Sequence, residues 1–194
     1  MTVNSIAIRS LSRRALLPAA AWLVASCASP NPVLYTLEPP PGPVRRGGPR
    51  VIELRSIGLA RYLERSQIVR SSENFRLDVI PNDWWGEPLD AMIGRTLERA
   101  LTQRLPGSTV YLENGAISAD PDATVQVNVE RLDQNANGAV RLVAQFAVLH
   151  RSGDTRGVTI EAPVRGGTTA DLVAAMSEAI GQLADRIAAA LAVG

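Results

Sequence analysis

Lysine is absent from the 194 residues, and histidine and cysteine occur once each, as His150 and Cys27. Without lysine the chain can form neither a Schiff base nor a Walker-type phosphate loop. A single cysteine cannot form an intramolecular disulfide. These absences exclude several common catalytic and cofactor-binding arrangements.

The chain also lacks a hydrophobic run long enough to span a membrane. Its most apolar segment, residues 15–25, is shorter than the roughly 20 residues that a bilayer-spanning helix needs. This segment follows Arg9, Arg13 and Arg14, which is typical of an export signal. Residues 12–17 also resemble a twin-arginine signal, but a merely cationic start is the favoured explanation, because signals of both export routes begin with positive residues. We predict a signal peptide over residues 1–26.

The end of this signal, Leu-Val-Ala-Ser-Cys over residues 23–27, resembles the lipobox of the lipoprotein signal peptidase. A buried structural cysteine is the alternative, but Cys27 lies where the apolar segment ends. We therefore predict cleavage before Cys27 and a membrane anchor of acyl chains, each buried methylene contributing about 0.8 kcal/mol. Ala28 at the next position favours the periplasmic face of the outer membrane, by the sorting rule of enterobacteria-like envelopes.

Cleavage would leave 17 arginines against 19 acidic residues, a net charge of −2. A nucleic-acid-binding protein needs a cationic surface to displace counterions from phosphates. The mature chain has no such excess, so we exclude this class of partner.

Two segments follow the signal. Residues 27–49 are expected to form a lipidated tether, because five prolines and three glycines between positions 38 and 49 disfavour a helix. Residues 33–37 could add a short edge strand within this tether. Residues 50–194 suit a single domain of ordinary size.

The hydrophobic period of residues 50–194 predicts an α+β fold. Amphipathic helices are expected over residues 87–105, with Pro88 in the first turn, and after a capping Thr168 or Thr169. Alternating patterns predict strands over residues 51–57, 75–79, 125–129, 140–148 and 156–164, with Pro81 ending the second and Asn137-Gly138 turning a hairpin. One-sided elements bury each other, so we predict a two-layer sandwich of a mainly antiparallel sheet with both helices on one face.

Three local motifs resemble one family. Residues 59–69, Leu-Ala-Arg-Tyr-Leu-Glu-Arg-Ser-Gln-Ile-Val, are close to its Tyr-Leu-acid-Arg-Pro-Gln-aliphatic-Val pattern, with Ser66 where proline is usual. Residues 85–89, Trp-Gly-Glu-Pro-Leu, and residues 35–37, Tyr-Thr-Leu, match two further patterns. The chain thus resembles the ABC-transport auxiliary lipoproteins of the paraquat-inducible protein C type.

The resemblance implies a noncatalytic, outer-membrane-anchored subunit of a transport system that moves phospholipid or a similar lipid and maintains the envelope. Its partners would be a mammalian-cell-entry-domain subunit and the inner-membrane ABC system, and a homo-oligomer is plausible. The candidate partner-binding residues are Tyr62, Arg65, Gln67, Trp84, Trp85 and Glu87. We expect no cofactor and no metal.

Each candidate has a structural alternative. Arg65 or Gln67 could instead satisfy loop carbonyls or pair with Glu87. Adjacent tryptophans cannot easily share one buried face, so we expect one in the core and one accessible. The arginines of the first helix, Arg95, Arg99 and Arg104, are expected on a solvated face.

Two other function classes are alternatives to a transport subunit. Catalysis has poor support, because Asp120-Pro121-Asp122 is typical of a turn and His150 has no metal-ligand or nucleophile motif near it. A structural or assembly lipoprotein of the envelope would share the tether and the domain, and only its partners would distinguish it.

Overall fold

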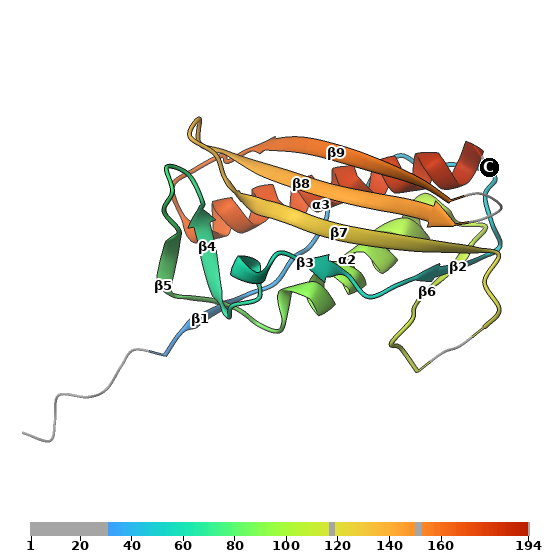
Figure 1. Ribbon diagram of the computed structural model, residues 1–194, viewed down its shortest axis with the longest axis horizontal. Coiled ribbons are helices and arrows are strands. Elements are labelled where there is room, and N and C mark those ends of the chain that lie inside the picture. The colour runs from blue at the N-terminus through green and yellow to red at the C-terminus, as the bar shows by residue number, and fades with distance from the viewer. Residues whose placement is uncertain (1–30, 117–118, 150–152, 194) are drawn as a thin grey trace, which may run out of the picture. The chain divides into compact units, whose positions relative to one another are not determined.

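The computed structural model describes residues 31–116, 119–149 and 153–193. The predicted signal peptide, Cys27 and His150 lie outside these described residues. From Pro32 onward, a sheet of nine strands packs one face against two helices (Figure 1). The predicted α+β class is therefore confirmed. No helix among the described residues is both long and apolar enough to cross a membrane.

The two helices are α2 (Leu89–Arg104) and α3 (Thr169–Val193), and each buries the apolar stripe that its period predicts. Pro88 precedes α2 as its N-cap residue rather than lying in its first turn. Thr168 caps α3, because its Oγ1 accepts the Asp171 backbone N–H at 3.2 Å. The Asp171 carboxylate in turn accepts the Thr168 backbone N–H at 3.0 Å. This reciprocal capping box satisfies N–H groups that the first helical turn leaves unpaired.

Three long strands form the predicted antiparallel meander: β7 (Ala123–Gln134), β8 (Ala139–Leu149) and β9 (Gly153–Pro163). Their inward residues, among them Val125, Val127 and Val129, are buried beneath the helices. Gly138 turns the first hairpin with a φ of 81°, which glycine adopts without a Cβ clash. A register shift between Val129 and Arg131 puts Leu132 back into the core.

The other edge of β7 is paired in three pieces, all parallel to it. The partners are β2 (Val51–Leu54), β3 (Gly58–Leu59) and β4 (Gln67–Ser71), and β6 (Thr109–Leu112) continues the sheet parallel to β2. The sheet is therefore mixed, although most paired residues lie in the antiparallel pairings of β7, β8 and β9. The period of a strand does not reveal the direction of its neighbour.

Strand β5 spans Asp78–Trp85, so the strand predicted over residues 75–79 and ended by Pro81 is wrong at both ends. The pairing of β4 with β5 shifts register between Val69↔Val79 and Gln67↔Trp84, leaving Pro81 in an irregular stretch. Proline is tolerated there because it need not donate to the ladder. Strand β1 (Val33–Tyr35) pairs parallel to the last residues of β5.

The proline-rich segment 37–49, here called the strap, runs along both helices (Figure 1). Leu37 is buried, and the backbone N–H of Glu38 donates to Ser177 Oγ of α3 at 3.1 Å. Gly42 exchanges two hydrogen bonds with the Gln103 side chain of α2. The strap is therefore docked against both helices.

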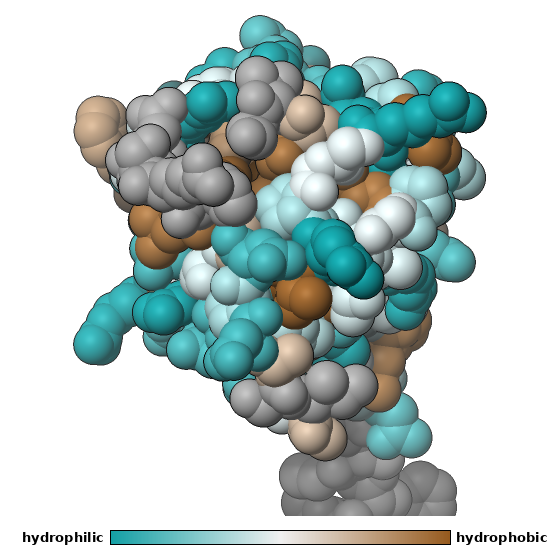
Figure 2. Space-filling view, turned by 90° about the vertical axis from the view of Figure 1, so that its right-hand side faces the viewer, coloured by the Kyte–Doolittle hydropathy of each residue, from teal (hydrophilic) through white to brown (hydrophobic). Residues whose placement is uncertain are grey.

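The outward face of the sheet is polar. Gln126, Asn128 and Gln145 alternate there with the buried residues of β7 and β8. At the end that carries the C-terminus, hydrophilic residues also predominate, with hydrophobic ones scattered among them (Figure 2).

Candidate functional site

The three motifs of the sequence meet at one corner of the domain. The Gly86 backbone N–H donates to the Tyr35 carbonyl at 2.9 Å, and the Trp85 N–H donates to the Ser66 carbonyl at 2.7 Å. Gln67 also pairs in register with Trp84. We call residues 35–37, 59–69 and 84–89 the motif corner. All six candidate residues lie in it, although they come from separate parts of the chain.

Tyr62 anchors the motif corner to strand β7. It lies in the short helix η1 (Arg61–Leu63), and its hydroxyl donates to Asp133 Oδ2 at 2.8 Å. Asp133 is fully buried, and its other oxygen accepts from Arg131 Nε at 2.9 Å. Arg131 also pairs with Glu73 at 2.6 Å. The buried carboxylate thus has two hydrogen-bond partners, as a buried charge requires.

The electrostatics of this network keep Tyr62 and Arg131 protonated. Burial, and then the negative charge of Asp133, raise the pKa of Tyr62, so its phenol remains a protonated donor. Partial burial lowers the pKa of Arg131, but its bonds to Glu73 and Asp133 raise it more. Tyr62 therefore serves first to hold η1 on β7, and it is only half-exposed.

Arg65 lies on the exposed outer surface of the corner. Its Nε donates to the Tyr62 carbonyl at 3.0 Å. Arg65 therefore satisfies a loop carbonyl, as the structural alternative predicted. Glu64 and Ser66 beside it are also exposed, whereas Gln67 is half-buried at the start of β4. The loop thus presents charged side chains on a backbone fixed by the Tyr62 network.

The two tryptophans divide as predicted. Trp85 is buried at 6% exposure, and Trp84 is half-exposed with its Nε1–H donating to the Pro81 carbonyl at 3.1 Å. Glu87 forms an ion pair with Arg95 and not with Arg65. The half-exposed Trp84 is adjacent in the sheet to the half-buried Gln67.

The prediction of a solvated arginine face on the first helix is wrong for Arg104. Arg95 and Arg99 are exposed, but Arg104 is only 1% exposed. Its Nε donates to Asp185 Oδ1 of α3 at 2.5 Å, and its guanidinium also reaches the Ala100 and Gly181 carbonyls at 3.2 Å. In the sequence, position 104 continues the apolar stripe formed by Leu97, Ala100 and Leu101. This helical spacing was the signal that the Arg104 side chain is buried.

The arginine also fastens the strap. Its Nη2 lies 3.5 Å from the Pro40 carbonyl, and its own backbone carbonyl accepts the Arg45 N–H at 2.7 Å. A Cβ added to Gly42 would overlap the guanidinium. Helices α2 and α3 and the strap therefore meet at one buried cation.

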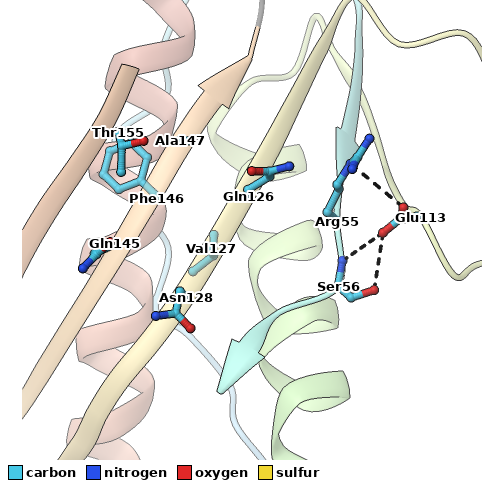
Figure 3. Close-up of a pocket in the computed structure, with 10 residues that line it drawn as sticks. All are labelled: Arg55, Ser56, Glu113, Gln126, Val127, Asn128, Gln145, Phe146, Ala147 and Thr155. Atoms are coloured by element: carbon cyan, nitrogen blue, oxygen red, sulfur yellow. Dashed lines mark hydrogen bonds and ion pairs between the residues drawn. The ribbon is translucent and has the colours of Figure 1, made fainter. Parts of the chain in front are cut away.

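A hollow of about 380 Å³ lies on the polar face of the sheet (Figure 3). The Glu113 carboxylate borders it, accepting the Ser56 backbone N–H at 3.3 Å and lying 3.9 Å from Arg55 Nε. Gln126 and Asn128 of β7 line the opposite side. The hollow is open, has both polar and apolar lining residues, and lies on the sheet face away from the helices, so it is not a lipid cavity between the layers.

Of the catalytic candidates of the sequence, only the segment 120–122 lies among the described residues, because His150 falls outside them. Asp122 Oδ2 accepts the Val51 backbone N–H at 2.9 Å, which fits the predicted turn. Among residues 31–116, 119–149 and 153–193, no three His, Cys, Asp or Glu side chains are grouped as metal ligands would be.

These features define an α+β domain with a mixed sheet, a docked strap and an exposed polar corner. The sequence profile of the ABC-type transport auxiliary lipoprotein components matches residues 35–188, and the chain belongs to this family. The match begins at Tyr35 of the motif corner and includes the whole corner.

Solved structures confirm the fold. The crystal structure of an uncharacterized protein has a TM-score of 0.70 at 20% identity, covering 83% of this chain and 99% of its own. Protein XCC0632 from Xanthomonas campestris, described under the family DUF330, has a TM-score of 0.68 at 18% identity, covering 84% of this chain and 95% of its own. Comparison with curated proteins gives no significant match.

Proposed function

We propose that this protein is a noncatalytic, lipid-anchored subunit on the periplasmic face of the outer membrane, serving an ABC transport system that contains mammalian-cell-entry domains and moves phospholipid. Its family is that of auxiliary lipoproteins of ABC-type transport. The anchor would be Cys27, at the lipobox. Its partner would be the mammalian-cell-entry subunit.

The observation that carries this proposal is the motif corner. The residues on which the family resemblance rests converge from three segments, and their outer surface includes the exposed Arg65 loop and the half-exposed Trp84. Tryptophan and arginine are enriched among residues that dominate protein interfaces. A loop held on a rigid scaffold is also where binding residues are commonly found.

The first test uses affinity purification of the tagged, full-length lipoprotein from membranes in mild detergent. Wild type should recover a mammalian-cell-entry protein, and Arg65→Ala should lose it while remaining folded. Arg141→Ala is the matched control, because Arg141 is a part-exposed arginine on the sheet and pairs with Glu161 at 2.7 Å. The control should retain the partner.

Recovery by wild type and by both variants would keep the transport role but remove the Arg65 loop as the contact. If wild type recovers envelope-assembly proteins and no mammalian-cell-entry protein, the transport proposal is wrong. Because Arg65 also supports the Tyr62 carbonyl, Asp133→Asn serves as a second control, since the fully buried Asp133 accepts the Tyr62 hydroxyl. It weakens the anchor of η1 without removing an exposed side chain, so a loss of partner caused only by loosening would appear in it too.

A further inference from the structure

The hairpin between β4 and β5 presents an apolar tip. Phe75 is fully exposed, at 111% of its reference surface, and Leu77 is 42% exposed. Isolated exposed hydrophobic residues are normal on protein surfaces. Here, however, two of them share one turn: the described residues contain six large exposed hydrophobics, of which Phe75 and Leu77 lie at the tip and two more lie on β1, beside the far end of β5. The six are Val33, Leu34, Val44, Phe75, Leu77 and Leu149.

The tip is held in place by its base. Asn74 and Phe75 both have positive φ, 54° and 60°, a backbone conformation that is uncommon for residues other than glycine. The turn is closed by the Arg76 N–H, which donates to the Glu73 carbonyl at 3.1 Å. Glu73 is bound by Arg131 of the buried network. The structure therefore maintains an outward-pointing Phe75 in a conformation that a free loop would avoid.

The tip lies toward the same end of the domain as strand β1, the first strand after the predicted anchor (Figure 1). Strand β1 and the β4–β5 hairpin lie at one end of the domain, and the C-terminus lies at the other (Figure 1). Val33 follows Cys27 by six residues, so a fully extended chain places the lipid at most about 20 Å from β1. The apolar end of the domain is thus the end that a lipid on Cys27 would hold near the bilayer. The opposite end shows hydrophobic residues only scattered among hydrophilic ones (Figure 2).

We propose that Phe75 and Leu77 insert into the interfacial region of the phospholipid membrane that holds the lipid anchor, an inference that rests on the proposed lipidation of Cys27. An aromatic ring and a leucine beside cations suit this region, because the rings enter the acyl boundary and arginines meet the phosphates. Arg70 of β4 is an exposed cation near the tip, 3.8 Å from Asp78 at the start of β5. A lipid tether alone leaves the domain free to rotate, whereas this second contact fixes its orientation.

The test places a probe at the tip without removing either apolar residue. Full-length lipoprotein carrying Arg76→Cys is labelled with an environment-sensitive NBD maleimide and reconstituted into phosphatidylethanolamine and phosphatidylglycerol vesicles containing a doxyl-labelled lipid. Val44→Cys on the strap is the matched control, because Val44 is also highly exposed, at 60%. A third sample carries Arg76→Cys together with Phe75→Ser and Leu77→Ser.

The probe at position 76 should shift its emission to the blue and lose intensity to the doxyl lipid, and the probe at position 44 should do neither. The serine substitutions should restore the emission at position 76. If vesicles carry the protein but the position-76 emission is unquenched, insertion is wrong while the anchor stands. If the probes behave identically at positions 76 and 44, insertion is equally refuted.

Failure of the anchor gives a different result. An acylated Cys27 has no thiol, so the wild-type chain should take up no maleimide and should float with the vesicles. Labelling of wild type together with its failure to float would refute the proposed lipoprotein function itself, and with it the insertion.

Discussion

Substitution of Asp185 should destabilise the domain because it leaves the buried guanidinium of Arg104 without its anionic partner. Arg104 has a side chain only 2% exposed, and the carboxylate of Asp185 is its one anionic partner within the described residues. Asp185→Ala should lower the free energy of unfolding by about 3 kcal/mol, the lower end of the range for breaking a buried pair from one side. The lower end applies because Asp185 is 30% exposed and the Ala100 and Gly181 carbonyls still accept.

The measurement is urea unfolding of the full chain in detergent, followed by tryptophan fluorescence, since Trp85 is buried in the core. Glu178→Ala is the matched control on the same helix. Glu178 pairs with the 76% exposed Arg165 at 3.6 Å, so its loss should lower the free energy of unfolding by about 0–1 kcal/mol. Both variants gain the same helix-favouring alanine, and their difference therefore isolates the buried pair.

The strap supplies a second readout of the same perturbation. If Arg104 fastens it, Asp185→Ala should speed tryptic cleavage after Arg45 and Arg46, because the Arg45 N–H is bound to the Arg104 carbonyl. Glu178→Ala should not. Equal unfolding free energies for the two variants would refute the assignment of the buried cation as the point that joins the helices and the strap.

Three further predictions concern single residues. Tyr62→Phe should lower the free energy of unfolding by about 1.5–3 kcal/mol, as measured in urea, because it removes a hydrogen bond to the buried aspartate of β7. Gly42→Ala should lower it by about 1–3 kcal/mol, since its Cβ would overlap a guanidinium, whereas Gly107→Ala, with nothing within 4 Å, should not lose stability through a steric clash. The hydrogen bonds from Thr168 lower the pKa of Asp171. Asp171→Asn should therefore be less stable than wild type at neutral pH, and this difference in the free energy of unfolding should disappear as the pH falls through the lowered pKa. An unchanged difference between wild type and Asp171→Asn at low pH would contradict this role.

Local patterns could be predicted because they arise from burial on one face. The apolar stripes of α2 and α3 and the alternating valines of β7 each record a single boundary between core and solvent. Turn and cap chemistry is equally local, as Gly138 and Thr168 show. Tyr62, Arg65, Gln67, Trp84, Trp85 and Glu87 were also selected from sequence motifs, and the structure brings them together.

The sequence by itself thus indicated the two one-sided helices, the three strands of the meander and the predicted lipobox at Cys27, but not strands β3, β4 and β6. Only the tertiary structure decided which strands pair in parallel and that Arg104 is buried. It also placed Pro81 in an irregular stretch of β5, where a proline is tolerated. The physical reason is range: Arg104 finds Asp185 at a separation of 81 residues, and Tyr62 finds Asp133 at 71. A charged side chain looks the same in the sequence whether it meets water or a distant partner, and only the folded chain selects between them.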